Sequence, residues 1–261
     1  MLVSLIITTY NRPDALLLVL QSVERQTTIP FNIIIADDGS NNETKEIIQN
    51  FQISTQLNVI HSWQKNKGFR VAKSRNKAIA KSDADYIVVI DGDMILHPYF
   101  LQDHINNAEI GYFIQGARAL LTKEATQVVL SGERVNFCFF SSGIKNRKNL
   151  IHSNFLSKIF LKKKNFLRGI KTCNMSFFKK DYLNINGFNN DFEGWGREDS
   201  EFAVRLLNNG VIRKNLHFNA IQLHLWHIEI IRTSLKKNDL ILKSTIKGNA
   251  KWCNNGIDKY L

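Results

Sequence analysis

The chain has 261 residues, is 44% hydrophobic and contains 14 Gly and only 3 Pro, which indicates an ordinary globular core and excludes disorder and collagen-like repeats. Its formal charge of +12 favours an anionic partner such as nucleic acid, a membrane surface or a phosphorylated substrate. No apolar run reaches the ~18 residues of a membrane helix, and the N-terminus lacks the features of a signal peptide. The three cysteines lack metal-ligand spacing and suit a reducing compartment. We expect a cytoplasmic protein.

The first hundred residues alternate short β-branched runs with helical patterns. Such alternation predicts βαβ units around a mostly parallel sheet with helices on both faces, an α/β fold. The expected strands cover residues 2–8, 31–36, 57–61 and 86–90, and the expected helices cover 13–26, 41–50 and 70–81. Later helices, loops and short strands are expected to join the same sheet, without a linker or a repeat.

Polar residues follow three of these strands, at residues 8–12, 37–40 and 91–93. Ligands of open α/β sheets bind outside the carboxyl ends of the strands. Asp91 and Asp93 flank Gly92 directly after an apolar strand, and such carboxylates hold Mg²⁺ or Mn²⁺ with positions left for a diphosphate. An ordinary Asp-Gly turn is the alternative interpretation.

The positive charge is concentrated between residues 134 and 180, which contain twelve Lys or Arg and no Asp or Glu. Apolar residues from Leu150 to Leu161 recur there at roughly helical spacing beside Lys158 and Lys162–Lys164, the pattern of a basic amphipathic helix. Either a solvated helix packed on the core or a helix that contacts anionic lipid headgroups or a lipid-linked acceptor fits this pattern. Nucleic acid is not expected, because no nucleic-acid-binding motif accompanies the charge.

These motifs together resemble glycosyltransferase family 2, inverting enzymes with the GT-A fold. The matching segments are LIITTYNR at 5–12, IADDGS at 35–40, NKG at 66–68 with Arg75, and DGD at 91–93. A second block, with NMSF at 174–177 and GWGREDSE at 194–201, resembles the carboxyl-terminal signature of β-1,4-galactosyltransferases. The resemblance implies a single domain over 1–261, with a nucleotide-binding half (1–100), an acceptor and catalytic half (101–230) and a helical tail (231–261).

The resemblance also assigns the donor site. It implies that a UDP-sugar is bound, with the uracil hydrogen-bonded by Asp38 and stacked in a pocket lined by Thr8, Tyr10 and Arg12. Arg70 and Arg75 match basic residues near the nucleotide, where Arg suits bidentate recognition. Asp91 is expected to reach the ribose or the metal, and Asp93 to coordinate the metal. The alternatives are that Thr8 and Tyr10 end a strand, that Asp38 caps the next helix and that Arg75 is a surface residue.

For the chemistry, the resemblance implies that Asp199 is the general base, that Glu198 binds the acceptor sugar and that Trp195 stacks on it. A helix amino terminus is the competing explanation for the two acidic residues. His227, with His224 as the alternative, matches the last ligand of a Mn²⁺ or Mg²⁺ site, with Mn²⁺ favoured. Arg197 departs from the Gly usual in the family.

The sequence therefore predicts a metal-dependent transferase that moves a hexose or N-acetylhexosamine from a UDP-sugar to a saccharide or lipid-linked acceptor. Its expected place is bacterial lipooligosaccharide, lipopolysaccharide or capsule synthesis, on the inner face of the plasma membrane. Two alternatives remain, a nucleotidyltransferase and a non-catalytic saccharide-binding relative. The first is expected to carry a Gly-rich amino-terminal loop, and residues 8–14 contain no glycine.

Overall fold

The computed structural model describes residues 1–133, 137–228 and 232–261. Arg134, the first residue of the predicted basic segment, lies outside the described residues. Within the described part of the chain, no helix is long and apolar enough to cross a membrane.

The amino-terminal part forms the predicted parallel βαβ units. The strands β1 (Val3–Thr9), β2 (Asn32–Asp37), β3 (Val59–Trp63) and β4 (Tyr86–Asp91) pair in the order β3-β2-β1-β4. Between them lie the helices α1 (Pro13–Glu24), α2 (Asn42–Ser54) and α3 (Val71–Ala80). All seven predicted elements are confirmed, with small shifts at their ends.

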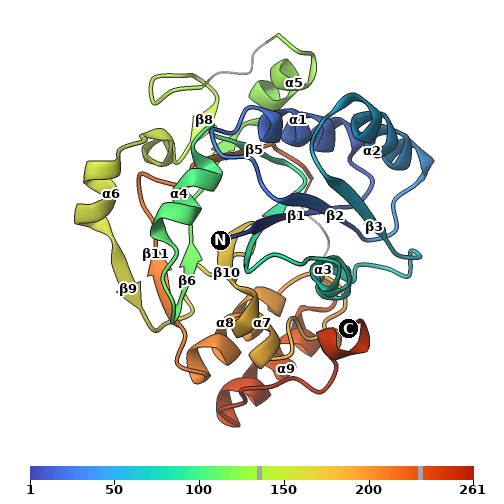
Figure 1. Cartoon of the computed structure of the whole chain (residues 1–261), viewed down its shortest axis with the longest axis vertical. Helices are drawn as coiled ribbons and strands as arrows, with labels where there is room; N and C mark the ends of the chain where they lie inside the picture. The colour runs from blue at the N-terminus through green and yellow to red at the C-terminus, as the bar shows by residue number, and fades with distance from the viewer. Residues whose placement is uncertain (134–136, 229–231) are drawn as a thin grey trace.

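Alternating apolar residues place a core on each face of this sheet. Leu5 and Ile7 of β1 belong to a buried cluster with apolar residues of α1 and α2, whereas Ile6 belongs to a second cluster with residues of α3. Because side chains of a strand alternate between the two faces, a continuous apolar run predicts a strand that is covered on both sides. Figure 1 shows α1 and α2 on one face of the sheet and α3 on the other.

The later strands continue the main sheet and also build a second one. β10 (Asn174–Phe178) pairs antiparallel with β4 and is followed by β6 (Tyr112–Gln115), β11 (Ile212–Asn215) and β9 (Lys162–Lys164). The expectation that all later strands join this sheet is wrong for four of the described strands. A separate small sheet contains β5 (Met94–Leu96), β12 (Gln222–His224), β7 (Ala119–Leu121) and β8 (Ile144–Lys145).

Besides α6 (Asn154–Phe160), seven further helical segments of the described chain pack around these sheets. They are α4 (Phe100–Asn107), α5 (Lys123–Leu130), η1 (Arg147–Leu150), α7 (Lys179–Asn184), α8 (Glu198–Asn208), α9 (Leu235–Lys247) and η2 (Ile257–Lys259). In Figure 1, α7 and α8 lie on the α3 side of the main sheet, with α9 next to α8. The contacts of α9 with α8 place the carboxyl-terminal part of the chain against the helix that starts at Glu198.

The predicted basic amphipathic helix is wrong in extent. Only Asn154–Phe160 is helical, as α6, and Lys162–Lys164 form the strand β9 instead, paired antiparallel with residues 213–215 of β11. The apolar spacing did not reveal where the helix ends, because the pairing of Lys162–Lys164 with the distant strand β11 is not encoded locally. The apolar side chains of α6, Phe155, Ile159 and Phe160, are exposed.

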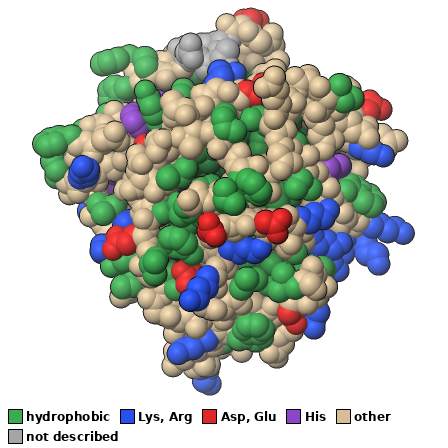
Figure 2. All heavy atoms as spheres, in the orientation of Figure 1, with side chains coloured by type: hydrophobic (Ala, Val, Ile, Leu, Met, Phe, Trp, Pro, Cys, Tyr) green, Lys and Arg blue, Asp and Glu red, His purple; other side chains and the backbone are tan. Residues whose placement is uncertain are grey.

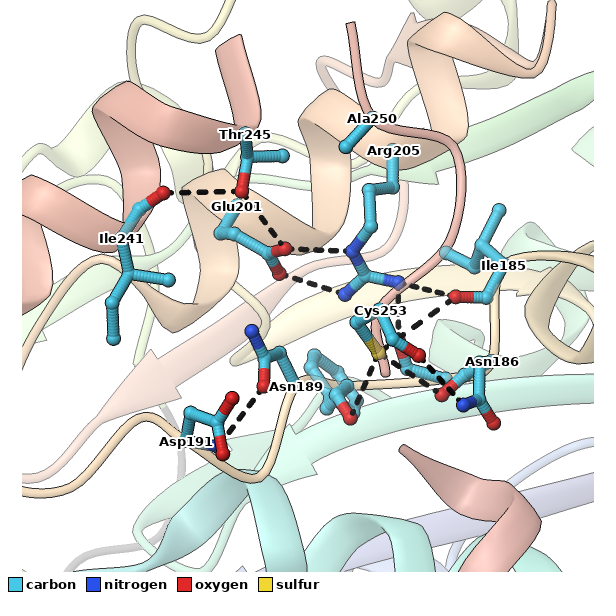
Figure 3. Close-up of polar contacts among 12 residues, drawn as sticks. Ile185, Asn186, Asn189, Asp191, Glu201, Arg205, Ile241, Thr245, Ala250 and Cys253 are labelled. Atoms are coloured by element: carbon cyan, nitrogen blue, oxygen red, sulfur yellow. Dashed lines mark hydrogen bonds and ion pairs between the residues drawn. The ribbon is translucent and has the colours of Figure 1, made fainter. Parts of the chain in front are cut away.

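A buried ion pair fixes α8 in the fold (Figure 3). The Arg205 guanidinium, fully buried, donates to both carboxylate oxygens of Glu201 at 2.7 Å and to the carbonyl oxygens of Ile185 and Gly187. Thr245 of α9 donates to the same Glu201 carboxylate. These bonds tie α8 to the loop at residues 185–187 and to α9, so they hold the amino terminus of α8 in place.

We expect Arg205→Ala to destabilise the protein by about 3–5 kcal/mol, because it leaves the Glu201 carboxylate buried without its partner. Urea unfolding at neutral pH measures this loss. The control is Lys237→Ala, which removes a partner from an exposed pair with Glu193 (side chains 63% and 61% exposed) and should change stability by less than about 0.5 kcal/mol. Equal losses in the two variants would contradict the structural role of Arg205.

Candidate active site

The Arg75 guanidinium connects three of the predicted site residues. Arg75 is only 3% exposed, and its Nε donates to Thr8 Oγ1 at 3.2 Å, its Nη2 to Asp91 Oδ1 at 3.1 Å and its Nη1 to Asp199 Oδ1 at 3.3 Å. Burial would lower the pKa of Arg75, but the charges of Asp199 and Asp91 raise it above its ordinary value. Arg75 is therefore a buried cation at the centre of the site and not a surface residue.

Asp199 is held from a second side by Thr172. The Thr172 hydroxyl donates to Asp199 Oδ1 at 2.6 Å and the Thr172 amide donates to Oδ2 at 3.0 Å. With Arg75, these bonds fix the orientation of the carboxylate. Only the Thr172 amide donates to Oδ2 among the described residues, so this oxygen has a lone pair left for a substrate.

Glu198 precedes Asp199 but experiences a different environment. Glu198 Oε2 is buried and has no hydrogen-bond partner among the described residues. Burial and the neighbouring Asp199 charge raise the pKa of Glu198 to about 8, although Arg75 opposes the shift. Both residues lie in the first turn of α8, so the helix-terminus interpretation of their position is confirmed, and the helix gives them a rigid support.

Asp93, His224 and His227 form a potential metal site. Nε2 of each histidine lies 3.5 Å from Asp93 Oδ2, and one ligand atom from each of the three residues lies within 4.8 Å of the others. Asp93 Oδ1 is buried without a hydrogen-bond partner in the described chain. Burial would raise the pKa of Asp93, but the hydrogen bond and charge of His224 and the charge of His227 lower it. An anionic carboxylate with a free oxygen beside two imidazoles could hold a divalent cation, and the imidazoles suit a transition metal such as Mn²⁺ better than Mg²⁺, which prefers oxygen ligands.

The structure therefore brings both candidate histidines to Asp93, although the sequence offered them as alternatives. β12 ends at His224, and His227 follows shortly after it. Between the two histidines, the Leu225 amide donates a hydrogen bond to the Asp93 carbonyl oxygen at 3.0 Å, which holds this segment beside Asp93. Asp91 does not belong to this cluster, because its carboxylate is paired with Arg75.

The turn after β2 carries Asp38, the residue predicted to bind the uracil. Asp38 is 3% exposed and accepts hydrogen bonds from Gln64 Nε2 at 2.6 Å and from the Arg70 amide at 2.6 Å. Burial raises the pKa of Asp38 against the effect of these bonds. Asp38 does not cap α2, since Asn41 accepts the bond from the Thr44 amide. Gly39 has a φ of +98° and leaves no room for a Cβ atom beside Asn66.

The remaining predicted residues differ in their exposure and in their contacts. The Tyr10 ring is 45% exposed and its hydroxyl accepts a hydrogen bond from Asn66 Nδ2. The positive charge of Arg12 helps to lower the pKa of Asp93. Trp195 is 37% exposed, and the Arg232 guanidinium lies 4.6 Å from the centre of its ring. Arg70 lines a cavity of about 420 Å³ with Asn190 and Asp191.

Arg197 adopts the left-handed conformation, with φ +78°, that a glycine would reach at lower cost. Its Nε lies 2.5 Å from Asp239 Oδ1 of α9. This ion pair links the loop before α8 to α9.

Three residues of the site were not found from the sequence. Thr172 positions Asp199, and Gln64 holds Asp38. Asp37 accepts bonds from the Gly39 and Ser40 amides and lies 2.9 Å from His61 Nε2. Burial would raise the pKa of Asp37, but the bonds from His61 and Ser40 lower it. For Asp37, the sequence signal was the pair of adjacent aspartates within residues 35–40. No sequence motif marked Thr172 or Gln64.

The raised pKa of Glu198 predicts that stability falls as pH rises from about 5 to 8. In this window the carboxyl ionises in the unfolded chain and stays protonated in the folded one, so the folded state binds more protons. The expected slope is at most about 1.4 kcal/mol per pH unit. Urea unfolding without divalent cations at pH 5, 6, 7 and 8 measures it for the wild type and for Glu198→Gln, which should lack this component.

The matched control is Glu193→Gln, which changes a carboxylate that is 61% exposed and should leave the pH dependence of the wild type unchanged. If wild type and Glu198→Gln give parallel curves over this range, the buried, protonated state of Glu198 is wrong.

Comparison with known proteins agrees with this geometry. The family described as glycosyl transferase family 2 matches residues 4–183, and the N-terminal domain of galactosyltransferase matches residues 156–227. The second match covers the start of α8, β12 and His227. Together they span the residues gathered around Arg75 and Asp93.

Curated relatives include polysaccharide synthases. The chain is 26% identical to chondroitin synthase of Escherichia coli over 233 residues, covering 79% of this chain and 32% of that protein. It is 28% identical to hyaluronan synthase of Pasteurella multocida over 240 residues, covering 82% of this chain and 23% of that protein. The chain thus spans about a quarter to a third of the length of these two relatives.

Solved structures share the fold. The crystal structure of residues 1–349 of Staphylococcus aureus TarS superposes with a TM-score of 0.63 at 17% identity, covering 95% of this chain and 65% of that one. The same protein in complex with UDP gives 0.63 at 15% identity, covering 93% and 64%. These neighbours confirm the expected GT-A fold. Since the first family match covers more than half of the sequence, the chain belongs to glycosyltransferase family 2.

Proposed function

We propose that the chain is a metal-dependent inverting glycosyltransferase that moves a hexose or N-acetylhexosamine from a UDP-sugar to a saccharide acceptor. The observation that carries this proposal is the position of Arg75, which joins the predicted donor residues Thr8 and Asp91 to the predicted base Asp199 through hydrogen bonds. Donor and base residues that share one buried cation lie within reach of a single reacting centre.

Asp199 is the general base of this proposal. The acceptor hydroxyl attacks the anomeric carbon, the bond between that carbon and the UDP oxygen breaks, and the hydroxyl proton passes to Asp199. Its Oδ2 has a lone pair to receive the proton, while Thr172 and Arg75 hold the other oxygen. Glu198, protonated at neutral pH because of its raised pKa, is suited to donate a hydrogen bond to the acceptor sugar, and Trp195 offers it an aromatic face.

Asp93, His224 and His227 would hold Mn²⁺ or Mg²⁺, with Mn²⁺ favoured by the two imidazole ligands. When bound, the ion would supply positive charge for the diphosphate of the leaving group. Tyr10, Arg12, Asp38 and Arg70 would bind the nucleotide, and the fold shared with a protein crystallised in complex with UDP supports a uridine nucleotide.

The bacterial chondroitin and hyaluronan synthases among the relatives support a growing saccharide as acceptor. The proposed setting is bacterial lipooligosaccharide, lipopolysaccharide or capsule synthesis, at the cytoplasmic face of the membrane. Membership of family 2 removes the nucleotidyltransferase alternative. A non-catalytic saccharide-binding relative remains the second candidate, and turnover separates it from the first.

A surface around α6 is suited to contact anionic lipid headgroups. Phe155 is 73% exposed and Ile159 59%, and the basic residues Lys158, Lys162 and Lys163 are exposed beside them. Figure 2 shows hydrophobic side chains gathered at this edge of the molecule with a basic side chain among them. Exposed aromatic residues among cations complement the interface of an anionic bilayer.

The catalytic proposal predicts UDP release from one member of a panel of UDP-sugars with Mn²⁺ and a saccharide acceptor. Asp199→Asn should lower turnover by about 10²–10⁴-fold, the usual contribution of a general base, with UDP binding kept. Asp93→Ala should abolish Mn²⁺-dependent UDP binding, measured by calorimetry. Asp83→Asn, an exposed aspartate outside the site, is the matched control and should behave as wild type.

If no UDP-sugar supports release and UDP does not bind with Mn²⁺, the uridine-nucleotide assignment is wrong. Metal-dependent UDP binding without turnover on any donor would instead favour the non-catalytic relative.

The membrane proposal predicts that Lys162→Glu/Lys163→Glu weakens sedimentation with phosphatidylglycerol-containing liposomes by at least about tenfold, since each basic residue near the surface contributes about 1 kcal/mol. Lys45→Glu/Lys243→Glu makes the same change of net charge at exposed sites elsewhere and should have a smaller effect. Equal effects of the two double variants, or no binding by the wild type, would contradict a lipid-docking role for this surface.

A further inference from the structure

Arg118 is a basic residue beside the active site to which the proposed reaction assigns no role. It follows β6 and directly precedes β7. Its Nη1 donates to the Cys173 thiol sulfur at 3.4 Å, and its Nε is buried without a hydrogen-bond partner among the described residues. A guanidinium has five N–H donors, and sulfur is a weak acceptor. Most of the hydrogen-bonding capacity of Arg118 is therefore unused by the residues that the structure describes.

The backbone around Arg118 is fixed. Asn149 Nδ2 donates to the Arg118 carbonyl oxygen at 2.7 Å, and Asn174 Nδ2 donates to the Ala117 carbonyl oxygen at 2.7 Å. At Gly116 a Cβ atom would lie 2.3 Å from Asn174 Oδ1, so the loop is closely packed there. A cation on such a rigid support keeps its place, which lowers the entropic cost of binding a ligand.

Lys171 provides a second cation from the opposite segment. The Gln115 side chain accepts a hydrogen bond from the Lys171 amide and donates one to the Lys171 carbonyl oxygen, both at 2.9 Å. Partial burial and the nearby charge of Arg118 lower the pKa of Lys171. The charges of Cys173 and Asp199 oppose this shift, so Lys171 is a cation close to both Arg118 and the carboxylate of the predicted base.

The pair lies on the side of the site where Asp199 is held. Thr172, whose amide and hydroxyl both bind Asp199, stands between Lys171 and Cys173, the residue that contacts Arg118. The charges of Arg118 and Lys171 both act on the Cys173 thiol, together with those of Asp91 and Asp199. The charge of Arg118 also acts on Asp91, a predicted donor residue, so the affinity for UDP is measured beside the affinity for the acceptor.

We propose that Arg118 and Lys171 bind a carboxylate or phosphate group carried by the acceptor saccharide. The inference rests on the proposed function in one respect, that Asp199 receives the proton of the acceptor hydroxyl, because this places the acceptor next to the pair. A guanidinium and an ammonium group are the side chains that recognise such oxyanions most strongly. The substrate class is therefore an acidic acceptor sugar rather than a neutral one.

The test is binding of two acceptors that differ only in the carboxylate, p-nitrophenyl β-D-glucuronide and p-nitrophenyl β-D-glucoside, to the enzyme saturated with UDP and Mn²⁺. A second pair, methyl glucoside 6-phosphate and methyl glucoside, tests phosphate. The wild type should prefer the anionic member of at least one pair. Arg118→Gln should reduce that preference by roughly ten- to a hundredfold, as expected for hydrogen bonds to a charged group, and Arg118→Lys should retain part of it.

Lys45→Gln, which removes an exposed cation of α2, is the matched control and should keep the preference. UDP affinity, measured on the same proteins, separates the acceptor from the donor. If Arg118→Gln and Lys171→Gln weaken UDP binding as much as anionic acceptors, or if the wild type shows no preference in either pair, the inference is wrong. Because these assays need no turnover, a preference for the anion without UDP release would reject the proposed transfer reaction and not this inference.

Discussion

The buried Arg75 guanidinium is the interaction on which the geometry of the site depends. Thr8 at the end of β1, Asp91 at the end of β4 and Asp199 at the start of α8 converge on it. Carboxylates that approach one another in a partly buried site repel unless a cation lies between them. Arg75 supplies that cation from α3, so the two parts of the chain that carry the predicted donor and acceptor residues meet there. Removal of one partner of such a buried pair is costly.

The amino terminus of α8 presents two neighbouring carboxyl groups that differ in their hydrogen-bond partners. Asp199 is surrounded by donors, Arg75 and Thr172, whereas Glu198 Oε2 has no partner in the described chain and the pKa of Glu198 is raised to about 8. A protonated Glu198 can donate a hydrogen bond, while Asp199 accepts hydrogen bonds from Arg75 and Thr172. The Glu201 and Arg205 pair, one turn further along α8, keeps this arrangement rigid.

The carboxyl-terminal segment of the chain contacts the loop that leads into α8. Asp239 of α9 pairs with Arg197, and Arg232 covers one face of the Trp195 ring. Both contacts involve the loop that leads into Glu198. The carboxyl-terminal segment thus contributes to the shape of the loop that carries Trp195 and Arg197.

The sequence by itself determined the elements of the parallel half, the GT-A resemblance and the carboxylates at the ends of strands. Apolar periodicity and turn residues act over a few positions, so β1, α1 and the Asp91 to Asp93 turn are readable locally. Only the tertiary structure decided which groups meet. Arg75 and Asp199 are 124 positions apart, Thr172 carries no motif, and His224 and His227 both reach Asp93. Lys162–Lys164 became a strand because pairing with β11 prevailed over a helical pattern. Such outcomes depend on packing between distant segments, which local patterns do not encode.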